Sequence, residues 1–244
     1  HDLGHPPFAH SGEEILNECM NDYDGFDHNA QTLRILTSLE ERYPSFNGLN
    51  LTWETLEGVV KHNGPLLDPH IVIKEYNKRH DLELNSYPGL EAQIASLSDD
   101  IAYNNHDIDD GFRAGFISLD DLKNIELFSE IIKEINSEFK GIDNYMIVKE
   151  LIRRLIGLMV NDLIKNTKKN ISKVSPKNAE EIRSHNGSIA SFSDFFISQD
   201  TQIRNFLRSR VYEHNSIEKE RVKSMRIIEE IFTKLIKNID LLPI

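Results

Sequence analysis

Apolar residues recur three and four positions apart along most of this 244-residue chain, which is the pattern of helices with one buried face. Alternating apolar and polar runs bounded by hairpin turns, the usual sign of a β-sheet, are missing from the sequence. The spacing predicts helices over residues 11–20, 28–43, 52–63, 71–80, 90–110, 120–139, 145–166 and 215–239. We therefore expect an all-α protein.

Local signals set the expected ends of these helices. Ser11 followed by Glu14 predicts a capping box with Ser11 as N-cap, and Thr52 is the expected N-cap of the third helix. Asn-Gly-Pro at 63–65 predicts that this helix stops there. The polar stretch 168–193 is expected to be a loop or small excursion, with a short strand near 189–192.

Length and composition fit one large globular domain, or a domain with a helical extension. Hydrophobic residues make up 39% of the chain. The sequence contains no run of about 18 apolar residues, which is the length that would predict a membrane span. Cys19 is the single cysteine, which fits a reducing, cytoplasmic setting. The chain starts at His1 rather than Met, so we expect it to lack its natural N-terminus.

The net charge of −12 is unevenly distributed. Residues 1–110 hold 6 Lys and Arg against 21 Asp and Glu, a net charge of −15, whereas the remainder carries +3. An acidic half is a poor general surface for nucleic acid but can suit divalent cations, which bind carboxylates and imidazoles. For most of these carboxylates a solvated acidic surface is the simpler interpretation.

Two clusters combine metal-ligand and proton-transfer groups. The chain opens HDLGHPPFAHSGEE, in which His1 and Asp2 can offer a nitrogen and an oxygen to one metal. In SDDIAYNNHDIDD (98–110), Asp99, Tyr103 and Asp107 are four residues apart and share a helix face. From spacing alone, the simpler interpretation of the second cluster is that Asp99 and Asp100 are a solvated acidic pair and Tyr103 is a core residue.

Four blocks of the chain resemble, in order, the HD-domain deoxynucleoside triphosphate triphosphohydrolases, and the bacterial dGTPase-like proteins most closely. They are HDLGHPPFAHSGE, FDHNAQTLRIL, GLNLTWETLEGVVKHNGP and ASLSDDIAYNNHDIDDGFRAG. FLRSRVYEH and the closing IIEEIFTKLIKNIDLLP resemble later helices of that family. The resemblance implies an HD-domain helical fold, with a catalytic core over 1–117 that lacks its first helix or helices and a C-terminal helical lobe over 118–244. The family's sequence also continues past Ile244, so a shortened C-terminus is expected as well.

The resemblance implies one divalent metal ion, of Mn, Mg, Fe, Co or Ni, held by an upstream histidine, the His-Asp pair and a distant aspartate. Carried over, His1 and Asp2 are the pair and Asp99 is the distant ligand, with Asp100 as its rival. The upstream histidine should precede His1, so we expect this chain by itself to bind metal weakly, which would impair or abolish its own activity.

The same resemblance implies hydrolysis of dNTPs to deoxynucleoside and inorganic tripolyphosphate by attack of water at the α-phosphorus. His10 resembles the general acid/base histidine and Glu13 its orienting carboxylate. The residues expected to contact substrate are His5 and His28 near the phosphates and Tyr103 and Asp107 at the sugar.

Other polar residues have plainer expected roles. His62 is either pocket-adjacent or a helix-end residue, Lys61 is expected to be solvated, and Arg34 is expected to serve structure only. A structural or surface role is expected for His70, His80, His106, His185 and His214.

Two alternatives to the leading function remain open: an HD phosphohydrolase acting on another nucleotide phosphate ester, and a nucleotide-binding oligomeric regulator without catalysis. Family members are often oligomeric with regulatory nucleotide sites, so we expect a homo-oligomer and allow for an activating nucleotide. Binding of single-stranded nucleic acid would need a basic groove with interleaved aromatic residues. The basic second half offers Arg204, Arg208 and Arg210 near the aromatic residues Phe206 and Tyr212, but a solvated helix face is the simpler explanation.

Overall fold

The computed structural model describes residues 1–242 and is all-α, as the periodicity predicts. Within that range there is no β-strand, only an isolated bridge between Tyr43 and Phe46. The expected strand near 189–192 is therefore wrong; this segment is an irregular connection before a helix. Pro243, in the closing block quoted above, lies outside the described residues.

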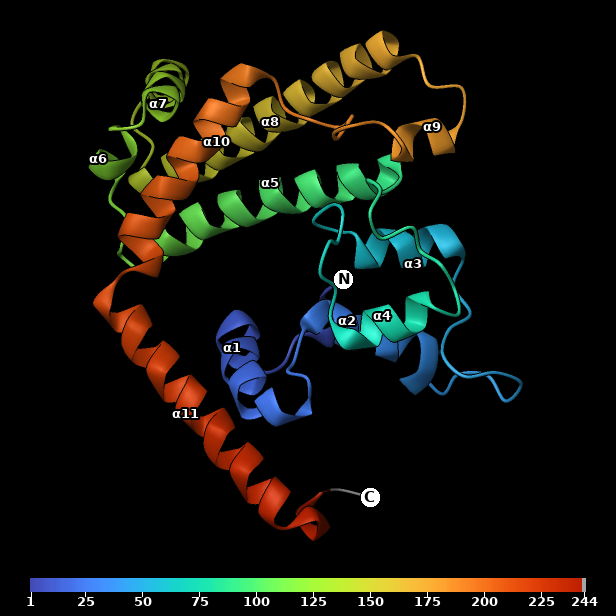
Figure 1. The fold of residues 1–244 in the computed structure, drawn as a ribbon. Helices are drawn as coiled ribbons and strands as arrows, with labels where there is room; N and C mark the ends of the chain where they lie inside the picture. Colours follow the sequence, from blue (N-terminus) through green and yellow to red (C-terminus); the bar gives the residue numbers. More distant parts are fainter. Residues whose placement is uncertain (243–244) are drawn as a thin grey trace. The chain divides into compact units, whose positions relative to one another are not determined.

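Eleven α-helices and five short 3-10 or π segments follow one another along residues 1–242 (Figure 1). The α-helices are α1 (Ala9–Cys19), α2 (His28–Arg34), α3 (Trp53–Val60), α4 (Ile71–Asn77), α5 (Leu90–Arg113), α6 (Leu119–Leu122), α7 (Glu126–Glu138), α8 (Asn144–Val174), α9 (Ala179–Arg183), α10 (Asp194–Leu207) and α11 (Asn215–Lys237). The short segments are η1 (Asp2–Gly4), η2 (Asn21–Tyr23), η3 (Ile35–Leu39), η4 (Arg208–Tyr212) and η5 (Ile239–Leu241).

Several helix ends differ from the expected ones. The predicted cap at Ser11 is wrong, because α1 already begins at Ala9 and the Gly12 N–H donates to the Phe8 carbonyl. Thr52 is confirmed as the N-cap of α3, where its side chain accepts a hydrogen bond from the Thr55 N–H. The expected helix 120–139 is split into α6 and α7, and α8 extends eight residues beyond the expected end at 166.

The first of two compact units contains residues 1–93, 178–187 and the described residues from Lys219 onward. Its main hydrophobic core joins α2, α3 and α4 with the segment that follows α4. The buried members are Ala30, Leu33, Leu36, Leu56, Val60, Ile73, Leu82 and Leu84. This unit carries the whole opening motif of the chain.

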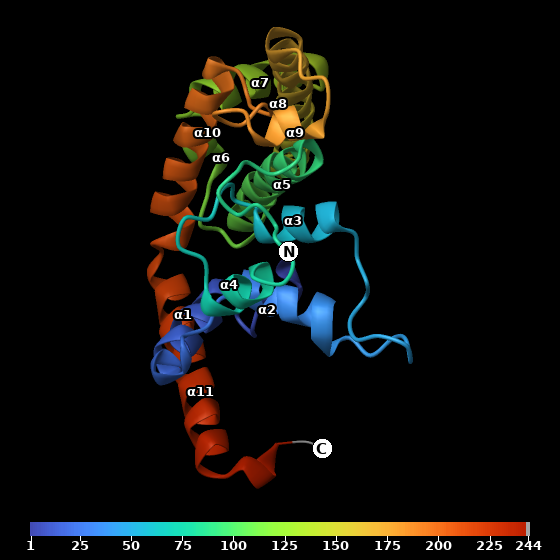
Figure 2. The ribbon, with the colours of Figure 1, turned by 45° about the vertical axis from the view of Figure 1, so that its right-hand side comes forward.

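The second unit contains residues 94–177 and 188–218. Its core is built by α5, α7, α8 and α10, which lie beside one another in both views of Figures 1 and 2. Side chains buried at its centre include Ile108, Phe128, Ile135, Leu151, Leu155, Met159 and Ile203. Segments of the two units thus alternate along the chain. The domain boundary at residue 117, which the family resemblance implies, stays a prediction.

No helix among residues 1–242 is both long enough and apolar enough to cross a membrane.

Candidate functional site

The His-Asp pair lies on a short turn that is anchored to α2. The Gly4 N–H donates to the Thr32 hydroxyl at 2.9 Å, and that hydroxyl donates to the His1 carbonyl. A side chain at Gly4 has no room, because a Cβ there would lie 2.1 Å from the His28 carbonyl oxygen. Thr32 is fully buried and holds both ends of η1. The sequence analysis missed Thr32; its one signal is a polar residue on an otherwise apolar helix face.

The donor atoms of the opening pair lie together. His1 Nε2 and Asp2 Oδ1 are 2.9 Å apart, which is a hydrogen-bond distance. It is also about the separation of two ligands that hold one ion at right angles with bonds of ~2.1 Å. The His1 ring stacks on the ring of His62, with centroids 3.7 Å apart and planes inclined by 12°. The donor set of this region therefore fits a divalent transition metal.

Three further histidines gather next to this pair. His5 stacks on His28 with centroids 4.0 Å apart, and His10 lies edge-on to His5 at 5.1 Å. Nε2 of His5 is 3.6 Å from Asp2 Oδ1. Burial, and then the neighbouring His28 and His10, lower the pKa of His5 below its ordinary value. The first unit thus brings the predicted residues Asp2, His5, His10 and His28 together.

Glu13 approaches the cluster from α1 and contacts His28. Its carboxylate accepts a hydrogen bond from the His28 backbone N–H and lies 2.8 Å from Nδ1 of the same residue. Burial acts to raise the pKa of Glu13, but these hydrogen bonds outweigh it and hold the pKa below its ordinary value. The hydrogen-bond partner of Glu13 is thus His28, whereas the resemblance paired Glu13 with His10. His5, Glu13 and His28 also form a group whose ligand atoms lie within 4.8 Å of one another.

The other predicted residues lie on α5 in the second unit. Asp99 is exposed and Tyr103 is 52% exposed, so the alternative that Tyr103 is a core residue is wrong. Asp100, the rival ligand, is ion-paired with Arg204 at 3.0 Å. The contribution of Asp99 to the same ion as His1 and Asp2 stays a prediction from the sequence.

Asp107 has a partner that the sequence analysis did not identify. The hydroxyl of Tyr212, in the π segment η4, donates to the Asp107 carboxylate. Burial raises the pKa of Asp107 despite this hydrogen bond, and burial followed by the bond to Asp107 raises the pKa of Tyr212. Segments of π-helix are frequent at functional sites. Asp107 and Tyr212 are 105 residues apart in the sequence, so no spacing argument links them.

Lys61 corrects another expectation, because its side chain is fully buried rather than solvated. Its ammonium lies 2.7 Å from Glu57 and donates to the Glu83 carbonyl, the Ser86 hydroxyl and the Tyr87 carbonyl. Arg34 is exposed. Among the remaining histidines, His70 caps α4 through Nδ1, which fits its expected structural role.

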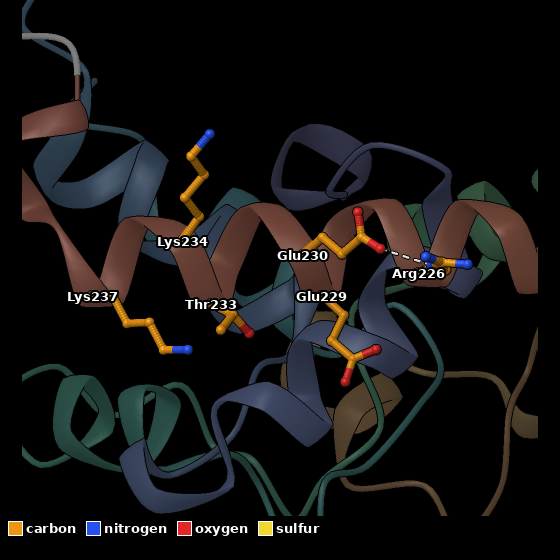
Figure 3. Close-up of a pocket in the computed structure, with 6 residues that line it drawn as sticks. All are labelled: Arg226, Glu229, Glu230, Thr233, Lys234 and Lys237. Carbon is orange, nitrogen blue, oxygen red and sulfur yellow. Dashed lines mark hydrogen bonds and ion pairs between the residues drawn. The ribbon is translucent and has the colours of Figure 1, made fainter.

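A surface hollow lies elsewhere, along α11 (Figure 3). Its lining residues are Arg226, Glu229, Glu230, Thr233, Lys234 and Lys237. Arg226 donates to Glu230 at 2.7 Å, and the drawn side chains spread from a single helix. One helix face cannot enclose a small molecule, so this hollow is a poor binding site.

Comparison with known proteins gives concordant matches. Residues 190–244 match the family described as "Phosphohydrolase-associated domain". Over 96% of its length, the chain is 44% identical to a deoxyguanosinetriphosphate triphosphohydrolase-like protein of Parvibaculum lavamentivorans, of which it covers 61%. Proteins of the same name in a Bradyrhizobium species and in Rickettsia felis are 48% and 44% identical over 95% and 100% of the chain. The chain is thus similar to these triphosphohydrolase-like proteins over nearly its whole length.

The chain spans about three-fifths of the length of these relatives, with 60% of the Bradyrhizobium protein and 64% of the Rickettsia protein covered. These matches confirm the resemblance drawn from the four sequence blocks. The roles of the individual site residues stay predictions.

Proposed function

We propose that the whole protein in which these residues occur is a metal-dependent dNTP triphosphohydrolase. The observation that carries the proposal is the cluster of His5, His10 and His28 beside the His1-Asp2 pair, in a chain 44–48% identical to proteins named for this activity. A neighbouring group of imidazoles and carboxylates suits both phosphate binding and proton transfer. The reaction would yield a deoxynucleoside and inorganic tripolyphosphate.

His1, Asp2 and Asp99 are the residues proposed to hold one divalent ion, of Mn, Mg, Fe, Co or Ni. A bound ion in such a site supplies Lewis-acid neutralisation of charge on a phosphate oxygen. Mixed imidazole and carboxylate ligands suit these ions.

The histidine cluster is proposed to handle the phosphates and the protons. His5 and His28 would donate N–H groups to phosphate oxygens, and Glu13 would fix the orientation and tautomer of His28 through the 2.8 Å contact at Nδ1. His10 is exposed and free of that carboxylate contact in the described residues, so it is proposed to transfer the proton during attack of water at the α-phosphorus.

Tyr103 and Asp107 are proposed to bind the deoxyribose. The ring of Tyr103 is half exposed and can pack against the sugar, and the Asp107 carboxylate can accept a hydrogen bond from the 3′-hydroxyl. Tyr212, which already donates to Asp107, would hold that carboxylate in position. A cytoplasmic location, a homo-oligomer and an activating nucleotide also stay predictions.

The test is product analysis with the whole protein. It is incubated with each dNTP singly and with dNTP mixtures, in the presence of Mn²⁺ or Mg²⁺, and inorganic tripolyphosphate is measured beside an Asp2→Ala control. Tripolyphosphate that disappears in the control supports the proposal. Orthophosphate from a nucleotide monophosphate would instead favour the other phosphohydrolase, and nucleotide binding without any product would favour the regulator.

A further inference from the structure

We infer that the Thr32 hydroxyl is a positioning group for the proposed metal site, because it fixes the turn that carries the His1-Asp2 pair. In this role Thr32 contacts neither the ion nor the substrate and acts through the backbone on either side of Asp2. The inference rests on the proposed function, since it concerns the ion that the pair is proposed to hold.

The first support is that one hydroxyl binds the backbone on both sides of Asp2. A hydroxyl can donate one hydrogen bond and accept others at the same time. Thr32 Oγ1 donates to the His1 carbonyl at 2.5 Å and accepts from the Gly4 N–H at 2.9 Å. These two backbone groups belong to the same 3-10 turn, η1 with its N-cap. The turn that carries the pair is therefore tied at two points to a single atom.

The second support is that this atom cannot move independently of α2. Thr32 is fully buried and lies one helical turn after His28. A Cβ on Gly4 would lie 2.1 Å from the His28 carbonyl oxygen and 2.4 Å from the Thr32 nitrogen, so η1 packs directly against this turn of α2. His28 in turn binds Glu13 and stacks on His5. One turn of α2 thus sets where the His-Asp pair lies relative to the histidine cluster.

Loss of the hydroxyl would change the geometry of the pair. Buried backbone groups rarely stay unpaired, so the His1 carbonyl and the Gly4 N–H would have to bond to each other or to water. Either change moves the turn, and the 2.9 Å separation of His1 Nε2 and Asp2 Oδ1 is then no longer held. Residues that orient metal ligands without touching the ion typically contribute ~10–100-fold to metal affinity.

The test compares two substitutions of Thr32 in the whole protein. Thr32→Val keeps the shape of the side chain and removes the hydroxyl, whereas Thr32→Ser keeps the hydroxyl and removes a methyl group. Thr37→Val is the matched control, because the Thr37 hydroxyl donates to the Leu33 carbonyl at 2.6 Å and does not contact η1. The apparent Kd for Mn²⁺ is measured by titration for the wild type, these variants and Asp2→Ala. Thermal unfolding without metal checks that each variant folds.

We expect Thr32→Val to weaken Mn²⁺ binding at least ~10-fold, and Thr32→Ser and Thr37→Val to bind Mn²⁺ within about twofold of wild type. Thr32→Ser should do so even though the loss of a buried methyl group lowers its Tm. Normal binding by Thr32→Val would overturn the inference. Weak binding by Thr32→Ser would also overturn it, because packing and not the hydroxyl would then be responsible, and this result decides even if Thr32→Val does not fold.

Release of tripolyphosphate from dNTPs, measured with the same proteins, separates this inference from the proposed function. If the wild type releases tripolyphosphate but Thr32→Val binds Mn²⁺ normally, the function stands and the positioning role falls. If Thr32→Val loses Mn²⁺ binding but the wild type releases no tripolyphosphate, the positioning role stands and the function falls. Equal Mn²⁺ binding by the wild type and Asp2→Ala would overturn the metal assignment on which both rest.

Discussion

At the scale of single residues, Lys61 offers a sharp prediction about stability. Lys61→Met keeps the length of the side chain but leaves the Glu57 carboxylate buried without its main partner. We expect the free energy of unfolding to fall by ~3 kcal/mol, the lower end of what breaking a buried pair costs, because Arg183 remains nearby. Urea denaturation measures this loss.

The double variant Lys61→Met/Glu57→Leu serves as the control for that interpretation. Since it removes both charges, it should recover most of the lost stability. A double variant as unstable as Lys61→Met alone would show that packing, and not the unpaired carboxylate, causes the loss.

The environment of Asp107 leads us to predict how the free energy of unfolding changes with pH. Its pKa in the folded chain lies above the ordinary 3.8, so the folded state binds the proton more tightly than the unfolded state. The stability contributed by this proton is fully present below 3.8 and is lost as the pH rises through the folded pKa. Asp107→Asn cannot ionise and keeps an acceptor for Tyr212.

The predicted loss of stability with rising pH is tested by the urea midpoints of wild type and Asp107→Asn, measured from about pH 3 to about pH 7. The variant should gain stability relative to wild type as the pH rises. A difference that stays constant, or that reverses, would mean that the Asp107 carboxylate is not disfavoured by its surroundings.

At the scale of elements, the contact of η1 with α2 depends on the absence of a side chain at Gly4. Gly4→Ala would place its Cβ 2.1 Å from the His28 carbonyl and 2.4 Å from the Thr32 nitrogen, both of which are backbone atoms. We expect a loss of ~2 kcal/mol or more and weaker metal binding, because the turn that carries the His-Asp pair must move. Thermal unfolding and metal titration check both effects.

Gly157→Ala is the matched control, since a Cβ there meets no atom within 4 Å and the residue lies inside α8. It should stabilise the protein by ~0.5–1 kcal/mol, the usual gain from alanine over glycine in a helix. Equal effects of the two substitutions would contradict the close approach at Gly4.

The helices themselves could largely be predicted from the sequence, because each buries an apolar face at a regular spacing. The long helix α5 was predicted from this spacing, and the N-cap at Thr52 from its residue type just before a helix. The break at Lys123 and Asn124 was not, since nothing but the capping box of Ser118 with Asp121 marks the short helix before it. Likewise, α2 continues into the π segment η3, and a change in helical winding leaves no trace in apolar spacing.

At the scale of the whole molecule, metal binding should appear as added stability. Metal that binds the folded state alone stabilises it by ~2.7 kcal/mol at 100 times Kd, which amounts to ~5–10 °C in Tm for 150–250 residues and to less for a longer protein. We expect Mn²⁺ to raise the Tm of the whole protein, EDTA to reverse the rise, and Asp2→Ala to abolish it. An equal rise in Asp2→Ala would place the ion elsewhere.

The candidate site could be predicted only as far as motifs reach. The opening block identified His1, Asp2, His5 and His10 because they stand within ten residues of one another. The partners that position them come from distant segments and have no motif: Thr32 under the turn, and His62 against His1. Such partners are set by packing between distant segments, and contacts of this kind cannot be inferred from a single sequence.

The first unit is assembled from segments that lie far apart in the sequence, and this has a consequence for its folding on the ribosome. Gly12 in α1 lies close to Ile228, and Glu14 is ion-paired with Arg221, both from α11. Residue 219 is translated about 125 residues after residue 93, which at 5–20 residues per second takes about 6–25 s. During that interval the nascent segment bearing the opening motif has left the exit tunnel without its α11 contacts, and it is then that a chaperone has the most exposed surface to bind.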